Sequence, residues 1–424
     1  MHNKVKVIQY LLVSCLLIFT SGSSQISTDK LWVIVWCIFS VAYCLFTQIR
    51  ASQQLFRVVV ILAGIAFLYY LINDAADQQT YLGFSVFILG AFSTVKIAGK
   101  MLPKILINIV YFAALVSLPL YIFQLISPNT LFELNNIFGL ISRNNSNSII
   151  FNFTYIHASR NCGFMWEPGA FAGVLIICIY INTIIIQNYK IGTRKNLVLF
   201  VTILTTLSTL GYVTLLFPLI AVIVHRNQYR YLIPIIIVLP LLANLDFLLP
   251  KFFKESNNVS SELNKTQYAT EDSQVSVSRS ASIAMDYSSF SERPILGYGV
   301  DFRTTSAEQI FGEYDENVIR SSGLMSLLLR FGLVGLLIYS YLIFRSIRFY
   351  ATFSSAVLFS LLVLFVLFSN PIDNSPLLFS LFFWQSYNPH PRNVTEPSAF
   401  HRTILTHTSR ETFADLNTDR KTTE

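Results

Sequence analysis

The sequence predicts an all-α, polytopic integral membrane protein with about twelve transmembrane helices. The first observation is composition: 53% of the 424 residues are hydrophobic and 12% are charged, whereas an average soluble domain has about a quarter charged residues. The second is a series of long apolar runs, and the third is an uneven distribution of Lys and Arg between the loops. Because too few polar side chains are present to cover a soluble fold, the composition excludes a cytosolic enzyme, a disordered chain and a secreted disulfide scaffold.

Each predicted span is an apolar run, because a helix needs roughly 20 apolar residues to cross the hydrocarbon core. Two of the runs meet at Gly211, and we predict two short helices there, since a single helix of about 30 residues would overshoot the bilayer. The first run is expected to be an uncleaved signal anchor. The runs are 5–22, 31–47, 55–73, 80–98, 105–126, 169–187, 196–210, 212–225, 231–249, 323–344, 351–369 and 375–387.

The loop charges orient these spans. With the N-terminus inside, the short outer loops hold Lys30 alone, and cationic loops favour the cytoplasm. Both termini are therefore predicted to be cytoplasmic, and the net charge of +7 needs no nucleic-acid partner. The cysteines form no CxxC pair, so no metal site is predicted. The short inner loops hold Lys4, Lys6, Arg50, Arg57, Lys96, Lys100, Lys104, Lys190, Arg194, Lys195, Arg226, Arg230, Arg345 and Arg348.

Two outer-face segments, 127–168 and 250–322, are too long to be simple connectors. Loops beyond about 15 residues are usually functional or disordered. The second loop contains an amphipathic stretch at 277–290, which predicts a helix on the outer membrane surface. We therefore expect one transmembrane bundle over 1–387 that includes both loops, followed by a polar, disordered cytoplasmic tail at 388–424.

The first candidate motif lies just before the sixth span and contains Arg160 and Glu167. Pro168 suits the first turn of a helix, where its missing N–H costs nothing. Glu167 then lies near the helix N-terminus, where negative charge is favoured. On residue types alone, the pair could equally be an ordinary acidic helix end with an Arg partner or a snorkelling Arg.

The second and third motifs flank the end of the long loop. Arg279 lies on the amphipathic helix, and Arg293 precedes a Pro-X-X-Gly-X-Gly segment that contains Gly297 and Gly299. Such a segment can bend tightly and bring backbone near a ligand, but no strand precedes it as in a dinucleotide fingerprint. The third motif places Arg330 inside the tenth span, where it is costly unless it is paired or faces water.

The order of these parts resembles the O-antigen polymerase (Wzy) and O-antigen ligase superfamily of bacterial inner-membrane glycosyltransferases. The likeness covers roughly 150–340 and includes the short helix pair at 206–212, the segment 294–299 and the span with 330–335. The segment 160–169 is similar to the motif before the central span of polymerase-like members. The resemblance implies a GT-C-like fold, an inner-membrane location, an undecaprenyl-pyrophosphate-linked oligosaccharide as donor, and no metal or other cofactor. A chain-length regulator and a flippase are the partners it suggests.

One departure from the superfamily favours a polymerase of O-antigen, capsule or exopolysaccharide repeats. Ligases typically carry His-Asn at the start of the span after the long loop, and this chain has Ser321 and Ser322 there. Three alternatives stay open: a ligase that transfers glycan to lipid A core, a transporter or flippase of precursors, and a non-catalytic assembly protein. A transporter is expected to concentrate charges within its spans, whereas these charges cluster in the outer loops.

The proposed chemistry assigns roles to these residues. Guanidinium groups suit a pyrophosphate leaving group, and Arg160 and Arg279 match the family positions. The acceptor hydroxyl needs a base, for which Glu167 is the first candidate. Direct attack on the anomeric carbon would invert its configuration. Asp286 and Glu292 are the reserve bases, although either could be a solvated loop charge, and the remaining expected substrate-site residues are Arg293, Gly297, Gly299 and Ser321.

Overall fold

The computed structural model describes residues 2–47, 56–61, 64, 78–131, 146–147, 149–153, 157–226, 279–299 and 322–384. By compactness the chain divides into Met1–Tyr387 and Asn388–Glu424. The second of these units, the expected span at 231–249 and most of the expected span at 55–73 lie outside the described residues.

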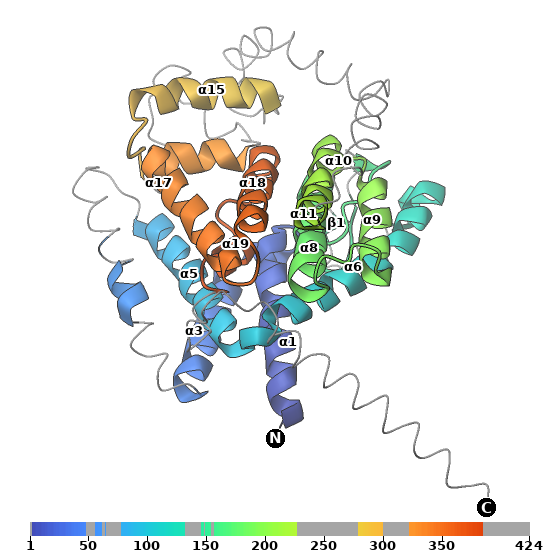
Figure 1. Cartoon of the computed structure of the whole chain (residues 1–424), viewed down its shortest axis with the longest axis horizontal. Helices are drawn as coiled ribbons and strands as arrows, with labels where there is room; N and C mark the ends of the chain where they lie inside the picture. The colour runs from blue at the N-terminus through green and yellow to red at the C-terminus, as the bar shows by residue number, and fades with distance from the viewer. Residues whose placement is uncertain are drawn as a thin grey trace, which may run out of the picture. The chain divides into compact units, whose positions relative to one another are not determined.

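The described part is almost entirely helical (Figure 1). A two-residue antiparallel ladder joins β1 (Ser146–Asn147) to β2 (Asn152–Phe153). The helices are α1 (His2–Ser21), α2 (Gln25–Thr28), α3 (Lys30–Thr47), α5 (Gln78–Ala98), η1 (Gly99–Met101), α6 (Leu102–Ile126), α8 (Pro168–Ile181), the π-helical turn η3 (Asn182–Ile186), α9 (Arg194–Thr206), α10 (Thr209–Thr214), α11 (Leu216–Arg226), α15 (Arg279–Glu292), α17 (Gly323–Arg348), α18 (Phe353–Ser369) and α19 (Pro376–Phe382).

Among the described residues, four helical stretches are long and apolar enough to cross a membrane: Lys30–Thr47, Leu82–Ile126, Pro168–Ile186 and Gly323–Arg348. Shorter apolar helices cover Val5–Ser21, Gly211–Arg226 and Phe353–Ser369. All of these coincide with predicted apolar runs. The chain is therefore a polytopic, helical integral membrane protein.

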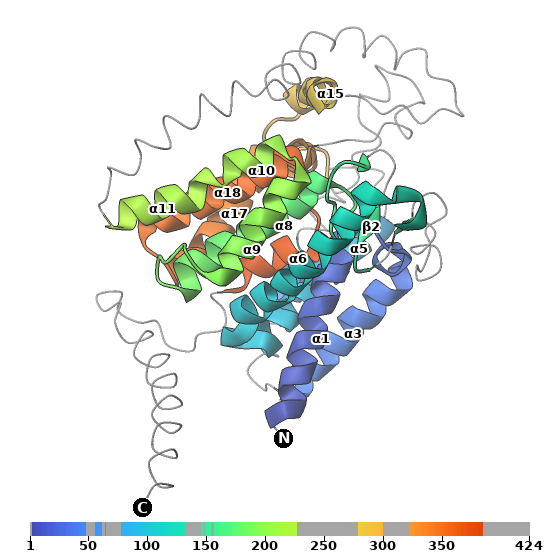
Figure 2. The same cartoon turned by 90° about the vertical axis from the view of Figure 1, so that its right-hand side faces the viewer.

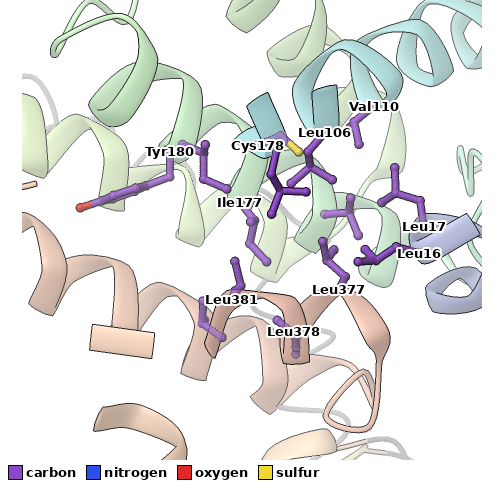
Figure 3. Close-up of a cluster of buried hydrophobic side chains, with 14 of the residues drawn as sticks. Leu16, Leu17, Leu106, Val110, Ile177, Cys178, Tyr180, Leu377, Leu378 and Leu381 are labelled. Carbon is purple, nitrogen blue, oxygen red and sulfur yellow. The ribbon is translucent and has the colours of Figure 1, made fainter. Parts of the chain in front are cut away.

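Helix α8 forms the centre of the core. Every α8 side chain from Ala170 to Ile181 is buried, as expected for a helix that is apolar all round. Its neighbours come from distant parts of the sequence: Ile177 and Cys178 of α8 meet leucines of α1, α6 and α19 (Figure 3). Gly173 allows α18 to approach closely, because a Cβ there would lie 2.6 Å from Val366 Cγ1.

The α9–α11 region is a hairpin, as predicted, but the turn comes earlier than Gly211. Helix α9 ends at Thr206, Leu207 adopts a left-handed conformation (φ 47°), and the Ser208 hydroxyl accepts a hydrogen bond from Gly211 N at the start of α10. His225, near the end of α11, stacks on Tyr189, which precedes α9, with ring centroids 3.4 Å apart. The chain therefore returns to the end from which α9 started (Figure 2).

Candidate functional site

The segment before α8 is fixed to α6 by hydrogen bonds to its backbone. Gln124 Nε2 lies 2.6 Å from Ala158 O and 3.2 Å from Arg160 O, and the Tyr121 hydroxyl donates to Ser159 O at 2.9 Å. A loop segment normally has few such anchors. The backbone that presents Arg160 is therefore held in place before any substrate binds.

Asn161 ties the same segment to α9. Its amide N–H donates to Thr205 O at 3.0 Å, its Nδ2 lies 2.9 Å from Thr205 Oγ1 and 3.2 Å from Ser117 Oγ, and its Oδ1 accepts from Gly163 N at 2.9 Å. A buried Asn with this many partners has its amide hydrogen-bonding capacity used internally. We therefore assign Asn161 a structural role.

The Arg160 side chain caps the end of α9. Nε donates to Thr206 O at 3.1 Å and Nη2 donates to Leu207 O at 3.2 Å. Carbonyls in the last turn of a helix lack intrahelical donors and carry partial negative charge, so a guanidinium is well suited to them. The sequence suggested a phosphate ligand, a Glu partner or snorkelling for Arg160, and did not suggest this helix cap.

Glu167 is the N-cap residue of α8, with an extended backbone (φ −144°, ψ 156°) and Pro168 in the first turn, as the sequence predicted. Its carboxylate does not cap the helix within the described residues. A Cβ on Gly169 would lie 3.5 Å from Glu167 Oε1 and 2.7 Å from Asn370 Oδ1. Glu167 and Asn370 therefore border the same glycine at the start of α8.

The two candidate charged residues, Arg160 and Glu167, both affect the pKa of Cys162. Burial raises the pKa of the Cys162 thiol to about 12, the Arg160 charge acts to lower this pKa, and the Glu167 charge acts to raise it further. Both effects require short distances, since Coulomb interactions fall with separation. The charges of Arg160 and Glu167 therefore both act on Cys162, which lies between them in the chain.

Helix α17 is broken at Gly332, which has φ 62° and ψ −163°. In a continuous helix, Leu333 N and Val334 N would donate to the carbonyls of Leu329 and Arg330. These four groups bond instead to the Pro-X-X-Gly-X-Gly segment. Leu333 N donates to Pro294 O (2.9 Å), Val334 N to Ile295 O (3.1 Å), Tyr298 N to Leu329 O (2.8 Å) and Gly299 N to Arg330 O (2.8 Å). We call this arrangement of 294–299 and 329–334 the clasp.

Two glycines of the clasp, Gly297 and Gly332, lie directly against backbone atoms of the opposite segment. A Cβ on Gly297 would lie 2.5 Å from Leu329 O, and a Cβ on Gly332 would collide with Ile295 O. The sequence predicted close backbone approach at Gly297 and Gly299, but to a ligand. In the structure, Gly299 N–H and the space at Gly297 are both taken by α17.

Arg330, immediately before the break, forms an ion pair with Asp373 in the loop between α18 and α19. Arg330 Nη1 lies 3.4 Å from Asp373 Oδ2, and the two side chains are 17% and 6% exposed. Ser326 Oγ donates to the same oxygen at 3.0 Å. Burial raises the Asp373 pKa, although Arg330 and Ser326 oppose the rise.

The sequence required Arg330 to be paired or to face water, and in the structure it is paired; its partner Asp373 was not among the predicted residues. The signal was available: a cation inside a span demands a nearby acid, and Asp373 lies between the last two apolar runs. Asn370 was not predicted either; its Oδ1 is buried without a hydrogen-bond partner among the described residues.

The predicted amphipathic helix exists as α15, two residues later at each end than 277–290. Arg279 is its first residue, and its side chain is outside the described part, as is Ser321. The reserve bases differ: Asp286 is buried, whereas Glu292 is exposed, with Oε2 3.0 Å from the Tyr298 hydroxyl. Arg293 lies over the Tyr298 ring, with Cζ 5.0 Å from its centroid.

Three segments meet at one end of the bundle. A Cβ on Gly323, at the start of α17, would lie 2.5 Å from Asn370 O and 3.1 Å from Asp373 Oδ1. Because Asn370 also borders Gly169, the start of α8, the 370–375 loop and the start of α17 converge. Helix α15 lies over the first part of α17, and the clasp joins the two at the break in α17 (Figure 1). In the part of the chain that the structure describes, no three His, Cys, Asp or Glu side chains are grouped closely enough to hold a metal ion.

Residues 196–340 match the family model described as O-antigen ligase (Wzy_C). This match confirms the resemblance to the Wzy and O-antigen ligase superfamily. The matched segment contains the α9–α11 hairpin, α15, the clasp and Arg330, while the 157–167 segment lies before it. The family implies a membrane glycosyltransferase or ligase activity. None of the curated proteins matches the chain.

Proposed function

We propose that this protein polymerises lipid-linked glycan repeat units of O-antigen, capsule or exopolysaccharide at the outer face of a bacterial inner membrane. The observation that carries the proposal is the O-antigen ligase family match over 196–340, combined with Ser321 and Ser322 at the positions where ligases typically carry His-Asn. The polytopic helical fold supports it, because the donor is anchored in the bilayer.

The proposed topology has twelve spans in a GT-C-like arrangement, cytoplasmic termini, and the 127–168 and 250–322 segments in the periplasm. The α9–α11 hairpin supports it, because the stack of His225 on Tyr189 returns Arg226 to the end that carries Lys190 and Arg194, the cationic side. Reporter fusions after Asn188 and Gln228 should both read cytoplasmic. An external reading after Gln228 would contradict this topology.

In the proposed reaction, a hydroxyl of one lipid-linked repeat attacks the anomeric carbon of the donor glycan. The bond from that carbon to the pyrophosphate oxygen breaks, a new glycosidic bond forms, and undecaprenyl pyrophosphate leaves with the bonding electrons. The hydroxyl proton passes to the carboxylate of Glu167, the residue that precedes the first turn of α8. One direct displacement inverts the anomeric configuration and needs no metal.

Arg160 and Arg279 are the proposed pyrophosphate ligands, because a guanidinium stays charged and binds phosphate oxygens through two parallel hydrogen bonds. Arg160→Ala and Arg279→Ala should each abolish polymer while the protein remains in the membrane, since one charge-assisted contact contributes about 1.5–3 kcal/mol. Replacing either arginine by lysine should retain part of the polymer formation that the Ala variant loses. Full polymer in either Ala variant removes that residue from the site. Arg293, Gly297, Gly299 and Ser321 remain proposed substrate neighbours.

The decisive experiment supplies purified protein with an undecaprenyl-pyrophosphate-linked repeat unit. A ladder of glycan lengths on the lipid indicates a polymerase. Movement of the substrate across a vesicle membrane without new glycosidic bonds indicates a transporter or flippase and contradicts the proposal. Addition of a chain-length regulator should change the ladder's length distribution, and addition of a flippase should supply substrate from the inner leaflet.

An O-antigen ligase is the second candidate, because the matching family model carries that description. A ligase transfers the glycan to lipid A core. Adding lipid A core to the same assay distinguishes the two activities, since a ligase yields glycosylated core and a polymerase yields longer lipid-linked chains with or without it.

A further inference from the structure

The Arg330–Asp373 pair and the clasp are not explained by the roles assigned so far. An Arg–Asp pair in a helical membrane bundle is costly, because both charges lose their hydration and the attraction between them recovers that loss only when the geometry is good. Here the contact is a single one of 3.4 Å, which falls short of the two-point fork that Arg forms with carboxylates. Stability alone would be served as well by apolar side chains of similar volume.

The break in α17 is also not needed to satisfy the backbone hydrogen bonds of the helix. A continuous α17 would make the two hydrogen bonds from Leu333 and Val334 without help from another segment. The clasp replaces them with four bonds to 294–299. It also places Gly332 in a backbone conformation that only glycine readily adopts. Conformations of this kind persist where the surrounding structure holds them, and they are frequent at functional sites.

The clasp and the ion pair both act on Arg330. Its carbonyl accepts from Gly299 N–H at 2.8 Å, and its guanidinium contacts Asp373, which Ser326 also holds. The clasp continues directly into Arg293 and α15. One unit therefore joins Arg293 and α15 to Arg330, and Asp373 joins that unit to the loop that borders Glu167 through Asn370.

We infer that Arg330 is a further binding residue for the pyrophosphate of the lipid-linked donor, that Asp373 positions its guanidinium, and that the clasp fixes the backbone that carries it. This inference rests on the proposed function. It assigns Gly297 and Gly332 to positioning: they act through Arg330 and need not touch the substrate.

The test measures binding of undecaprenyl pyrophosphate, and of uncharged undecaprenol as control, to the full chain in nanodiscs. The wild type should bind the pyrophosphate and not the alcohol. Arg330→Lys keeps the charge but loses the fork, so its Kd should rise about 3- to 10-fold. The double variant Arg330→Gln/Asp373→Asn removes both charges of the pair together, and its Kd should rise about 10- to 100-fold, because one charge-assisted contact is lost.

The results separate the alternatives. A purely structural ion pair predicts that the neutral double variant binds the pyrophosphate like the wild type, and that result overturns the inference while leaving the proposed function intact. Equal binding of pyrophosphate and alcohol by the wild type overturns the donor assignment, and with it both proposals. For Asp373→Asn, positioning predicts a raised donor KM with a nearly unchanged kcat; wild-type KM would overturn the role of Asp373.

The clasp is tested by hydrogen exchange at the amides of Tyr298, Gly299, Leu333 and Val334. In the wild type, undecaprenyl pyrophosphate should slow exchange at all four, a measurement that needs no variant. Gly332→Ala should speed exchange in both segments and weaken donor binding about 10-fold. Gly83→Ala is the matched control, because a Cβ there meets nothing within 4 Å. Unchanged exchange on donor binding, or wild-type binding by Gly332→Ala, would contradict the clasp's role.

Discussion

Helices α8 and α17 place charge at the same end of the bundle in opposite ways. Helix α8 is an uninterrupted, uncharged and buried helix, and its carboxylate, Glu167, precedes the first turn. Helix α17 carries Arg330 within its length and is broken two residues later. A charge at a helix end interacts favourably with the helix dipole, whereas a charge inside a span needs a partner. This difference explains why Arg330 in α17 is accompanied by both Asp373 and the clasp.

The glycines of the two helices differ for the same reason. Gly173 in α8 is small so that Val366 of α18 can pack against it, and its backbone is helical. Gly332 in α17 is glycine because of its backbone conformation and the nearby Ile295 carbonyl. A packing glycine can be compensated by a smaller neighbouring side chain, whereas a conformational glycine cannot.

The largest expected effect tests the α8 side. If Glu167 is the base, Glu167→Gln should lower the polymerisation rate by about 10²- to 10⁴-fold with donor binding nearly intact. Single-turnover kinetics and donor binding would be measured in parallel. Asp286→Asn and Glu292→Gln are the controls. Near-normal polymerisation by Glu167→Gln, with a loss in either control, would move the base to α15.

The next effect separates the two kinds of glycine. Gly332→Ala should lower the free energy of unfolding by about 1–3 kcal/mol from backbone strain alone, and Gly173→Ala by a similar amount from overpacking. Thermal unfolding in detergent would be compared for both. Adding Val366→Ala should restore stability to Gly173→Ala, whereas adding Ile295→Ala should not restore Gly332→Ala, because the collision is with a backbone oxygen. Rescue of Gly332→Ala would mean that its conformation is not strained.

A smaller effect concerns the cap that Arg160 forms on α9. Arg160→Lys cannot span Thr206 O and Leu207 O with the same fork, so the free energy of unfolding should fall by about 1 kcal/mol. Amide exchange near Leu207 should speed up, while exchange near Ser322 in α17 should not. Equal changes at both sites would show that Arg160 stabilises the whole of this end of the bundle and not one helix terminus.

The smallest effect compares the two helix starts. Ser322 Oγ accepts from Met325 N at the start of α17, so Ser322→Ala should lower the free energy of unfolding by about 0.5–1 kcal/mol. Glu167→Gln removes a favourable charge but no cap from α8, with an expected loss of about 0.3–1 kcal/mol. High salt should reduce the loss of unfolding free energy caused by Glu167→Gln and leave the loss caused by Ser322→Ala unchanged. Chemical unfolding of both variants at two salt concentrations would measure this.

The helices that carry the candidate site were predictable because their signals are local. Apolar runs at 169–187 and 323–344 match α8 with η3 and α17, since span length and residue type decide membrane insertion. The break between α9 and α10 was predicted from length, but at Gly211, four residues after the left-handed Leu207, because Leu207 gives no local signal for its conformation. Leu is not a residue type that favours that conformation.

The sequence by itself determined the membrane-embedded helical class, the motifs around Arg160 and Glu167, the Pro-X-X-Gly-X-Gly segment, and the cost of an Arg330 that is neither paired nor facing water. Only the tertiary structure decided that this segment completes α17, that Arg160 caps α9, and that Asp373 pairs with Arg330. The physical reason is range. Helix formation depends on residues within a few turns, whereas each of these hydrogen bonds and ion pairs joins groups that are distant in the chain, and nothing in either partner alone specifies the other.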